Sequence, residues 1–233
     1  MWFVWDCCGI ACAIITYGIM SSVLMITLQV AVNPLVEEEY WSQWLVNGIY
    51  ALLLGLAGTS HARCMLTNPG TIPKNTIETP IEQQLESKPK TGPHPCKKCR
   101  CMRPARAHHC STCGRCVLKM DHHCPWVNNC VGLYNQKHFV LFLLYILLSC
   151  LYTFALLIIR AMYCSQDREA DLCYRSRNDA AFDLFMGIIA FFVGTVFALF
   201  VSVMLYDQLY CIVHNTTGID QLQNTLTEKV ICT

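Results

Sequence analysis

Four adjacent residues, Asp121, His122, His123 and Cys124, place a carboxylate, two imidazoles and a thiol in one short run. A carboxylate that orients, an imidazole that takes a proton and a thiol that attacks are the parts of an activated cysteine nucleophile. Thiols and imidazoles are also the usual ligands of zinc. Residue types alone therefore leave Cys124 open between two roles, nucleophile and metal ligand.

The segment 96–130 around this run contains eight cysteines and four histidines. Cysteines separated by two residues recur in it, and this spacing lets two thiolates turn onto one metal ion. Two tetrahedral sites would use eight of these twelve side chains and leave several over. The spacing predicts zinc binding without allocating the ligands, and a nucleophile can be among the spare groups.

The composition indicates a membrane protein, because 54% of the 233 residues are hydrophobic and only 14% are charged. Soluble domains usually have roughly 25% charged residues. Apolar runs long enough to cross a bilayer predict an all-α polytopic membrane protein with four transmembrane helices. A buried helix of a soluble domain is the alternative for the second run, which is short and contains Asn47 and three glycines. The predicted spans are 9–32, 44–60, 139–159 and 184–206.

Basic residues predict the orientation, because short cytosolic loops are enriched in Lys and Arg. Twelve of the seventeen Lys and Arg residues lie in one segment, 61–138, which should therefore face the cytosol. It divides into a linker with six prolines and the cysteine-rich domain. The predicted divisions outside the membrane are the cytosolic N-terminus 1–8, luminal loop 33–43, cytosolic linker 61–95, cysteine-rich domain 96–138, luminal loop 160–183 and cytosolic tail 207–233.

This orientation affects how the cysteines are interpreted, since disulfides are rare in the reducing cytosol. Metal binding or catalysis is the expected use of the cytosolic thiols. Luminal Cys164 and Cys173 can form a disulfide. Cys7, Cys8 and Cys12, at the cytosolic edge of the first span, can be acylated. Ordinary packing is the alternative in both cases.

Between 96 and 139 the chain contains, in order, Cys96, Cys99, Arg103-Pro104, Arg106, His109-Cys110, Cys113, Cys116, Asp121-His122-His123-Cys124, Trp126-Val127, Asn129-Cys130 and Asn135. The order of these residues resembles the cysteine-rich domain of the DHHC-type protein S-acyltransferases, or palmitoyltransferases. The arrangement of four spans, with this domain between the second and third, is also similar to that family. Trp2-Phe3, the run 9–13 and the run 217–222 resemble its Golgi-specific DHHC zinc finger subgroup.

The resemblance implies two structural zinc ions with interleaved ligands and a separate catalytic set. Asp121 would orient His122, and His122 would act as general base for Cys124. A zinc ion with three thiolates and one neutral imidazole carries a net charge of 2 − 3 = −1, so it would not itself favour a nearby thiolate. The implied ligand sets are Cys96, Cys99, His109 and Cys116 for one ion, and Cys110, Cys113, His123 and Cys130 for the other.

The reaction that the resemblance implies begins with attack of Cys124 on a long-chain acyl-CoA such as palmitoyl-CoA. The acyl group then passes to a cysteine of a membrane or membrane-associated protein that faces the cytosol. Arg103 and Arg106 would meet the CoA phosphates, with solvated surface charge as the alternative. Trp126 would wall the mouth of an acyl cavity among the membrane helices. Tyr145 and Ser149 would line that cavity, with helix packing as their alternative.

Departures from the family pattern leave an alternative function open, a catalytically impaired short form that acts as a membrane scaffold. The usual Asp-Pro-Gly reads Asn68-Pro69-Gly70, the usual Thr-Thr-x-Glu reads Thr217-Gly218-Ile219-Asp220, and the chain stops at Thr233.

Two other classes of zinc protein fit the sequence less well. A RING-type ubiquitin ligase also interleaves the ligands of two zinc ions, but the gaps between its ligands are longer than those in this chain. A net charge of +1 argues against a nucleic acid partner. The expected partners are acyl-CoA, substrate proteins and the bilayer, and the expected location is the Golgi membrane.

Overall fold

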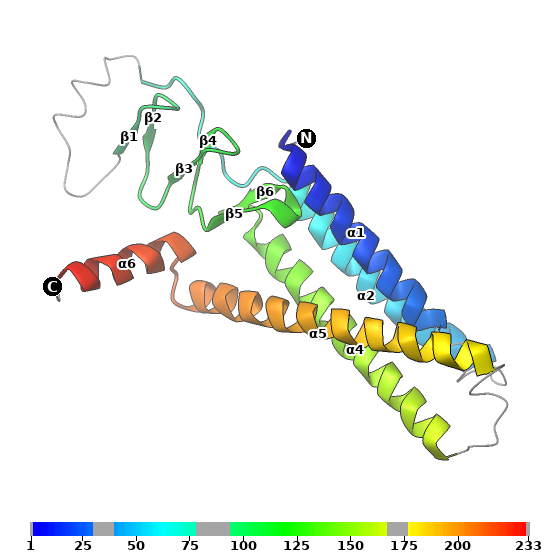
Figure 1. Cartoon of the computed structure of the whole chain (residues 1–233). Helices are drawn as coiled ribbons and strands as arrows, with labels where there is room; N and C mark the ends of the chain where they lie inside the picture. Colours follow the sequence, from blue (N-terminus) through cyan, green and yellow to red (C-terminus); the bar gives the residue numbers. More distant parts are fainter. Residues whose placement is uncertain (1, 30–39, 78–93, 167–176, 232–233) are drawn as a thin grey trace. The chain divides into compact units, whose positions relative to one another are not determined.

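The computed structural model describes residues 2–29, 40–77, 94–166 and 177–231 and is mostly helical (Figure 1). Its long helices are α1 (Cys7–Thr27), α2 (Tyr40–Leu66), α4 (Gln136–Gln166) and α5 (Arg177–Val213). Each contains a segment long and apolar enough to cross a membrane. The four predicted membrane helices are confirmed, including the short second one. The segments are Cys7–Thr27, Trp44–Leu66, Gln136–Met162 and Ala181–Val213.

The helices extend beyond most of the predicted spans. The apolar run ending at residue 60 continues as helix to Leu66, and the run ending at 206 continues to Val213. Backbone hydrogen bonding does not stop where the apolar layer ends, so counting apolar residues misses the polar turns at each end. The first helix instead ends before the predicted end of its span, residue 32. α1 ends at Thr27, and residues 30–39 lie outside the described part of the chain.

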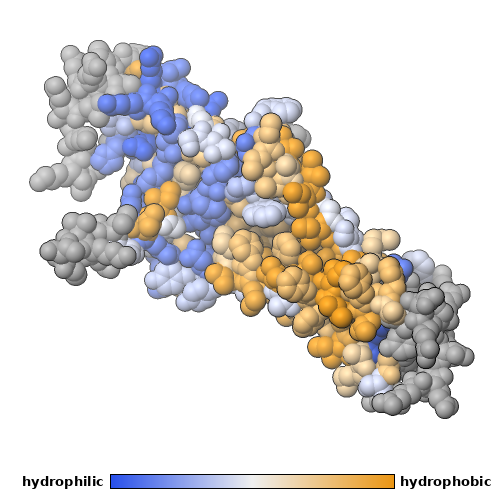
Figure 2. Space-filling model, in the orientation of Figure 1, coloured by the Kyte–Doolittle hydropathy of each residue, from blue (hydrophilic) through white to orange (hydrophobic). Residues whose placement is uncertain are grey.

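Large apolar side chains cover the outer faces of these helices. Phe192, Leu199 and Val203 are each about two-thirds exposed, at 68%, 66% and 69%. Figure 2 shows hydrophobic side chains gathered over the helices and hydrophilic ones over the region of the hairpins. So much exposed apolar surface is stable only against lipid. The chain is a multi-pass membrane protein.

The structure divides into two compact units, and one of them consists of Ile15–Thr59 and Leu141–Tyr206. Within it the hydroxyls of Tyr50 and Thr153 lie 2.7 Å apart and join α2 to α4. A guanidinium nitrogen of Arg160 donates to Asp183 over 3.1 Å and joins α4 to α5. Helix contacts in lipid rely on such polar pairs, because apolar burial drives them little.

The other unit consists of Met1–Ile14, Ser60–Val140 and Asp207–Thr233. It contains three two-stranded antiparallel hairpins, a short 3-10 helix and a final α-helix. Strands of three residues bury too little apolar surface to be stable alone, so this unit needs another source of cohesion. Its elements are β1 (His94–Cys96), β2 (Cys101–Arg103), β3 (His108–Cys110), β4 (Arg115–Val117), β5 (His122–Cys124), η3 (Pro125–Val127), β6 (Asn129–Val131) and α6 (Gly218–Ile231).

Two segments are more ordered than the sequence predicts. Part of the expected linker pairs with the hairpins, since Ile72 N donates to Cys116 O over 2.9 Å and Asn75 N to Cys99 O over 3.0 Å. Residues 78–93 of that linker lie outside the described part. The expected cytosolic tail contains α6. Both segments order because their backbone donors find carbonyl or carboxylate partners in the cysteine-rich domain.

The cysteines differ between the predicted luminal and cytosolic sides. Cys164 is disulfide-bonded, and its predicted partner Cys173 lies outside the described residues. No other cysteine of the described part is disulfide-bonded. This division agrees with a reducing cytosolic side and an oxidising luminal side.

Candidate active site and metal sites

Alternation along β3 creates two separate clusters of thiols and imidazoles. Successive residues of a strand point to opposite faces, so His109 and Cys110 reach different clusters. In each cluster the ligand atoms all lie within 4.8 Å of one another. The structure thus brings together the two sets that the resemblance implied. They are Cys96, Cys99, His109 and Cys116, and Cys110, Cys113, His123 and Cys130.

The first set has the dimensions of a tetrahedral zinc site. Nδ1 of His109 lies 3.8 Å from Sγ of both Cys96 and Cys116. It lies 3.2 Å from Sγ of Cys99. Zn–S and Zn–N bonds of about 2.3 and 2.0 Å place tetrahedral ligands roughly 3.5 Å apart. The donor atoms therefore fit a zinc ion without rearrangement of the hairpins.

The second set has similar dimensions. Nδ1 of His123 lies 3.6 Å from Sγ of Cys110, 3.4 Å from that of Cys113 and 3.6 Å from that of Cys130. Hydrogen bonds with Cys113 and Cys130 lower the pKa of Cys110. A thiolate is the form that binds metal. This set fits zinc equally well.

The ligands also make up much of the buried interior of the domain. Cys99, Cys116 and Cys130 are at most 1% exposed. Cys101 is fully buried beside the first set but is not one of its members. A domain with such a core depends on its metal ions for stability. These ions would hold the hairpins together and leave the chemistry to other residues.

The same alternation separates the candidate catalytic residues from the metal ligands. On β5, His123 points to the second metal set, so its neighbours His122 and Cys124 occupy the opposite face. Neither His122 nor Cys124 belongs to either metal set. Cys124 is 7% exposed. One three-residue strand thus presents a metal ligand on one face and an imidazole with a thiol on the other.

Asp121 is held by three donors. Nδ1 of His122 donates to its Oδ2 over 2.7 Å, and Nε2 of Gln208 donates to the same oxygen over 2.8 Å. The backbone N–H of Gly218 donates to Oδ1 over 2.6 Å. Burial raises the pKa of this carboxyl, but the three hydrogen bonds outweigh it and lower the pKa overall. The carboxylate is therefore charged and fixed in orientation.

This contact fixes the imidazole of His122. With Nδ1–H on Asp121, the remaining ring nitrogen Nε2 is buried and has no hydrogen-bond partner among the described residues. The ring packs edge-on to Phe139, with centroids 5.3 Å apart. Burial lowers the pKa of His122, but Asp121 and the nearby thiol of Cys124 outweigh it and raise the pKa to about 9. Nε2 is thus available to exchange a proton with a reacting group.

Buried asparagines anchor the turn that follows Cys124. Asn128 adopts a left-handed conformation, φ 45°, and its side chain donates to the carbonyl of Val4 over 2.8 Å. The amide of Asn129 donates to three carbonyls at the end of α2, over 2.9 to 3.1 Å. The carbonyl of Trp126 accepts from Nε2 of His61 over 2.9 Å. Both the N-terminal segment and α2 therefore fix the position of the β5–β6 hairpin.

A reciprocal capping box starts α6. Thr217 N donates to Oδ2 of Asp220 over 2.9 Å, and Asp220 N donates to Oγ1 of Thr217 over 3.2 Å. This pairing satisfies donors at the helix N-terminus. Asp220 also accepts from Nε of Arg106 over 2.8 Å. The box and the ion pair together hold the backbone of Gly218 against Asp121.

Loss of this cap should loosen the start of α6. We expect Thr217→Ala to destabilise the region by about 1 kcal/mol and to increase hydrogen exchange at residues 217–221. Thr217→Ser keeps the hydroxyl and should behave as the wild type. Equal protection in the alanine and serine variants would contradict the capping role.

The residues predicted to contact acyl-CoA have different surroundings. Nε of Arg103 is buried with no hydrogen-bond partner among the described residues, whereas Arg106 is engaged by Asp220. The side chain of Trp126 is 39% exposed. Tyr145 and Ser149 belong to the other unit, where Oγ of Ser149 donates to the carbonyl of Tyr145 over 2.8 Å.

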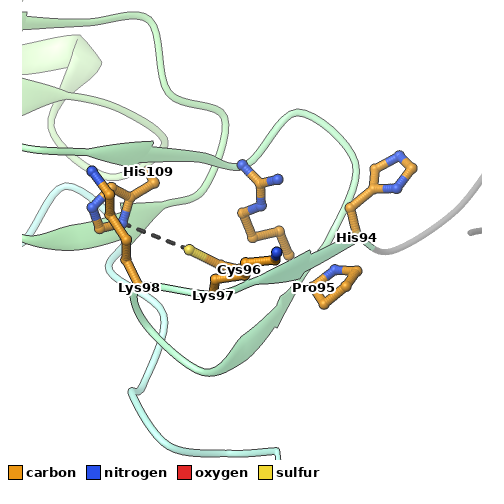
Figure 3. A pocket seen from close by; sticks show the side chains of 7 residues that line it. His94, Pro95, Cys96, Lys97, Lys98 and His109 are labelled. Carbon is orange, nitrogen blue, oxygen red and sulfur yellow. Dashed lines mark hydrogen bonds between the residues drawn. The ribbon is translucent and has the colours of Figure 1, made fainter. Parts of the chain in front are cut away.

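Arg103 also lines a pocket of about 640 Å³ at the first hairpin (Figure 3). Lys97 and Lys98 contribute two further positive charges. The pocket borders the first metal set through Cys96 and His109. Three basic side chains around one hollow make it suited to an anionic group. Its other lining residues are His94 and Pro95.

The fold and the site together define a multi-pass membrane protein in which two clusters of potential metal ligands lie beside a carboxylate, an imidazole and a thiol. Comparison with known proteins agrees. Residues 90–225 match the family model described as DHHC palmitoyltransferase. The chain is 41% identical over 224 residues to the human protein Palmitoyltransferase ZDHHC3, covering 96% of this chain and 73% of that protein. It therefore belongs to the DHHC palmitoyltransferase family of protein S-acyltransferases.

Two other relatives also match most of the chain. The rat protein Palmitoyltransferase ZDHHC7 is 36% identical over 225 residues, which is 96% of this chain and 71% of that protein. The Arabidopsis thaliana protein Probable protein S-acyltransferase 14 is 33% identical over 197 residues, which is 78% of this chain and 62% of that protein. The similarity includes the membrane helices as well as the cysteine-rich domain.

Proposed function

We propose that the chain transfers a long-chain acyl group from acyl-CoA to protein cysteines through a thioester on Cys124. The observation that carries the proposal is the arrangement on β5. His122 and Cys124 share the face opposite the metal ligand His123, and the imidazole is fixed by its 2.7 Å hydrogen bond to Asp121. These are the relations that a thiol nucleophile and its base require.

In the first step, Sγ of Cys124 attacks the thioester carbonyl carbon of the acyl-CoA. The proton of the thiol is held on Nε2 of His122, because the raised pKa of this imidazole favours its charged form beside the Cys124 thiolate, and CoA leaves as a thiolate that takes this proton. In the second step, the thiol of a substrate protein attacks the acyl group on Cys124, and His122 returns the proton to the Cys124 sulfur. Each step exchanges one thioester for another, so the cycle needs no other energy source.

The remaining residues would position the reactants. Asp121 would keep the proton of Nδ1 in place and favour the charged imidazole that forms in each step. Zinc ions on the two Cys3His sets would stabilise the hairpins and take no part in the transfer. The apolar tail of the donor would enter the membrane, where each methylene removed from water contributes about 0.8 kcal/mol. Trp126, Tyr145 and Ser149 remain the proposed residues along its path.

The pocket at the first hairpin would hold the phosphates of CoA. Arg103, with a buried Nε and no protein partner among the described residues, is suited to this role, together with Lys97 and Lys98. We expect Arg103→Gln to raise the KM for acyl-CoA about ten-fold or more, since a hydrogen bond to a charged group contributes about 1.5–3 kcal/mol. The measurement is the rate of CoA release against acyl-CoA concentration.

Arg100→Gln is the matched control, because Arg100 is exposed on the turn of the same hairpin and does not line the pocket. It should leave the KM unchanged. A similar rise in both variants would indicate general attraction of the anion, and no rise in Arg103→Gln would exclude the pocket as the CoA site.

The substrates would be proteins with cysteines at the cytosolic face of the membrane, and the subgroup resemblance supports the Golgi membrane as the location. No observation favours the alternative of a non-catalytic scaffold. The test is incubation of the purified, zinc-loaded chain with clickable palmitoyl-CoA. We expect a label that hydroxylamine removes and that passes to an added membrane-anchored cysteine peptide. A folded chain that takes no label would contradict the proposal.

A further inference from the structure

The carboxylate of Asp121 depends on a side chain that is distant in sequence, Gln208 near the end of α5. Gln208 is fully buried, and its Nε2 donates to Oδ2 of Asp121 over 2.8 Å. The same oxygen accepts the Nδ1–H of His122 over 2.7 Å. A carboxylate oxygen has two lone pairs, so these two donors use both of them. Gln208 therefore restricts Oδ2 to the arrangement in which it meets the imidazole.

Gln136, the first residue of α4, favours the orientation of the Gln208 amide in which nitrogen faces Asp121. Its Nε2 donates to Oε1 of Gln208 over 3.2 Å. An amide has its acceptor and its donors on different atoms, so an amide whose oxygen faces a donor presents its nitrogen on the other side. The two glutamines thus form a hydrogen-bonded relay with one direction, from Gln136 through Gln208 to Asp121. All three residues belong to the same compact unit.

The first turn of α4 supports the imidazole of His122 as well. Phe139 is buried and packs edge-on to this ring, with centroids 5.3 Å apart. Phe139 follows Gln136 by three residues, and residues at this spacing are neighbours on a helix surface. One turn of helix therefore contacts the imidazole directly and reaches its carboxylate partner through Gln208.

The chemistry of an amide suits this buried position. Buried polar atoms are stable when they are hydrogen-bonded, and neither polar atom of the Gln208 side chain is unpaired among the described residues. A lysine or arginine could also donate to Asp121, but its positive charge would offset that of the carboxylate. The neutral amide holds the carboxylate and leaves its negative charge to stabilise the imidazolium of His122.

We propose that Gln208 is a positioning residue for acyl transfer, which acts through Asp121 on His122. The inference rests on the proposed function, in which Nε2 of His122 holds the proton of the Cys124 thiol. Without the amide, Oδ2 loses one of its two donors, and the carboxylate can rotate away from Nδ1 of His122. The imidazole is then aimed less often at the reacting sulfur. Donor binding is unaffected, because neither Gln208 nor Gln136 lines the pocket proposed for the CoA phosphates.

The test is the rate of acyl loading of the purified, zinc-loaded chain over a range of clickable palmitoyl-CoA concentrations. Gln208→Met keeps the approximate size of the side chain but cannot donate. We expect the rate at saturating donor to fall about ten-fold, as for one lost hydrogen bond to a charged group. The half-saturating concentration and the zinc content should not change. Gln221→Met is the matched control and should load at the wild-type rate, because Gln221 is half-buried in the same unit and donates to Sγ of Cys211 instead.

Variants of Gln136 test the direction of the relay without altering a fully buried residue. Gln136→Lys keeps a donor toward Oε1 of Gln208. Gln136→Glu has nearly the shape of the wild type but offers only acceptor oxygens, which repel Oε1 and compete for the amide hydrogens. Gln136→Lys should therefore load about five-fold faster than Gln136→Glu, as for one hydrogen bond between neutral groups. Equal rates would contradict the relay, and this comparison decides the question even if Gln208→Met loses zinc.

A double substitution separates positioning from a general structural role. If Gln208 acts through the carboxylate, Gln208→Met should cause no further loss in Asp121→Asn, because the interaction is already broken. A further drop of similar size in the double variant would overturn the inference, as would wild-type loading by Gln208→Met or a change in its half-saturating concentration alone. These results would leave the proposed function intact. A folded wild-type chain that takes no label would overturn the proposed function, and the inference with it.

Discussion

Replacing Cys124 by serine should abolish acyl loading and acyl transfer while leaving the zinc content unchanged. Cys124 provides the nucleophile in the proposed mechanism, and a hydroxyl is a much weaker nucleophile at neutral pH. Loss of a nucleophile typically lowers the rate by roughly 10⁴-fold or more. The measurement is label from clickable palmitoyl-CoA on the zinc-loaded chain, with transfer to a membrane-anchored cysteine peptide as a second readout.

This substitution also separates the two roles that the sequence leaves open for Cys124. A metal ligand at this position would make Cys124→Ser lose zinc and destabilise the hairpins. A nucleophile on the face opposite His123 predicts the full zinc content and an unchanged unfolding temperature. Loss of one zinc ion per chain would therefore contradict the assignment. The matched control is Cys101→Ser, which alters another buried cysteine and should keep acyl loading.

The parts of the site that are close in sequence could be predicted from the sequence. Cys96 and Cys99 are two residues apart, and Asp121, His122 and Cys124 lie within one short run. The resemblance allocated the metal ligands, and the structure brings the same sets together. The reason is physical, because a domain without an apolar core is specified mainly by its ligand positions.

Contacts between distant segments could not be predicted in this way. Gln208 and Gly218 hold Asp121 across 87 and 97 residues of sequence. Neither residue type is unusual at the end of a membrane helix or in a loop. Only the return of the C-terminal segment to the cysteine-rich domain brings them to the carboxylate. No local spacing reveals such a contact.

One missed element did have a local signal. Thr217 and Asp220 have the spacing of a capping box, which predicts a helix N-terminus. In the sequence these residues count as part of a subgroup resemblance and as a departure from a family motif but not as a helix cap, so the segment is expected only as a cytosolic tail and α6 is not predicted. The three-residue strands had no comparable signal, because an alternating pattern needs at least four residues to be recognised.

Replacing one zinc ligand should unfold part of the cysteine-rich domain and thereby abolish acyl loading. We expect Cys99→Ser to lose one zinc ion per chain, since serine does not replace a thiolate in a tetrahedral Cys3His site. Structural zinc contributes about 10–16 kcal/mol of binding free energy, which is as large as the whole stability of a typical domain, about 5–15 kcal/mol. The hairpins that carry His122 and Cys124 should then lose their fixed geometry.

Metal analysis and acyl labelling of the same preparation measure both effects, with Cys101→Ser as the control. Cys101 is fully buried two residues away from Cys99 but lies outside the ligand set, so equal zinc loss in both variants would refute the assignment.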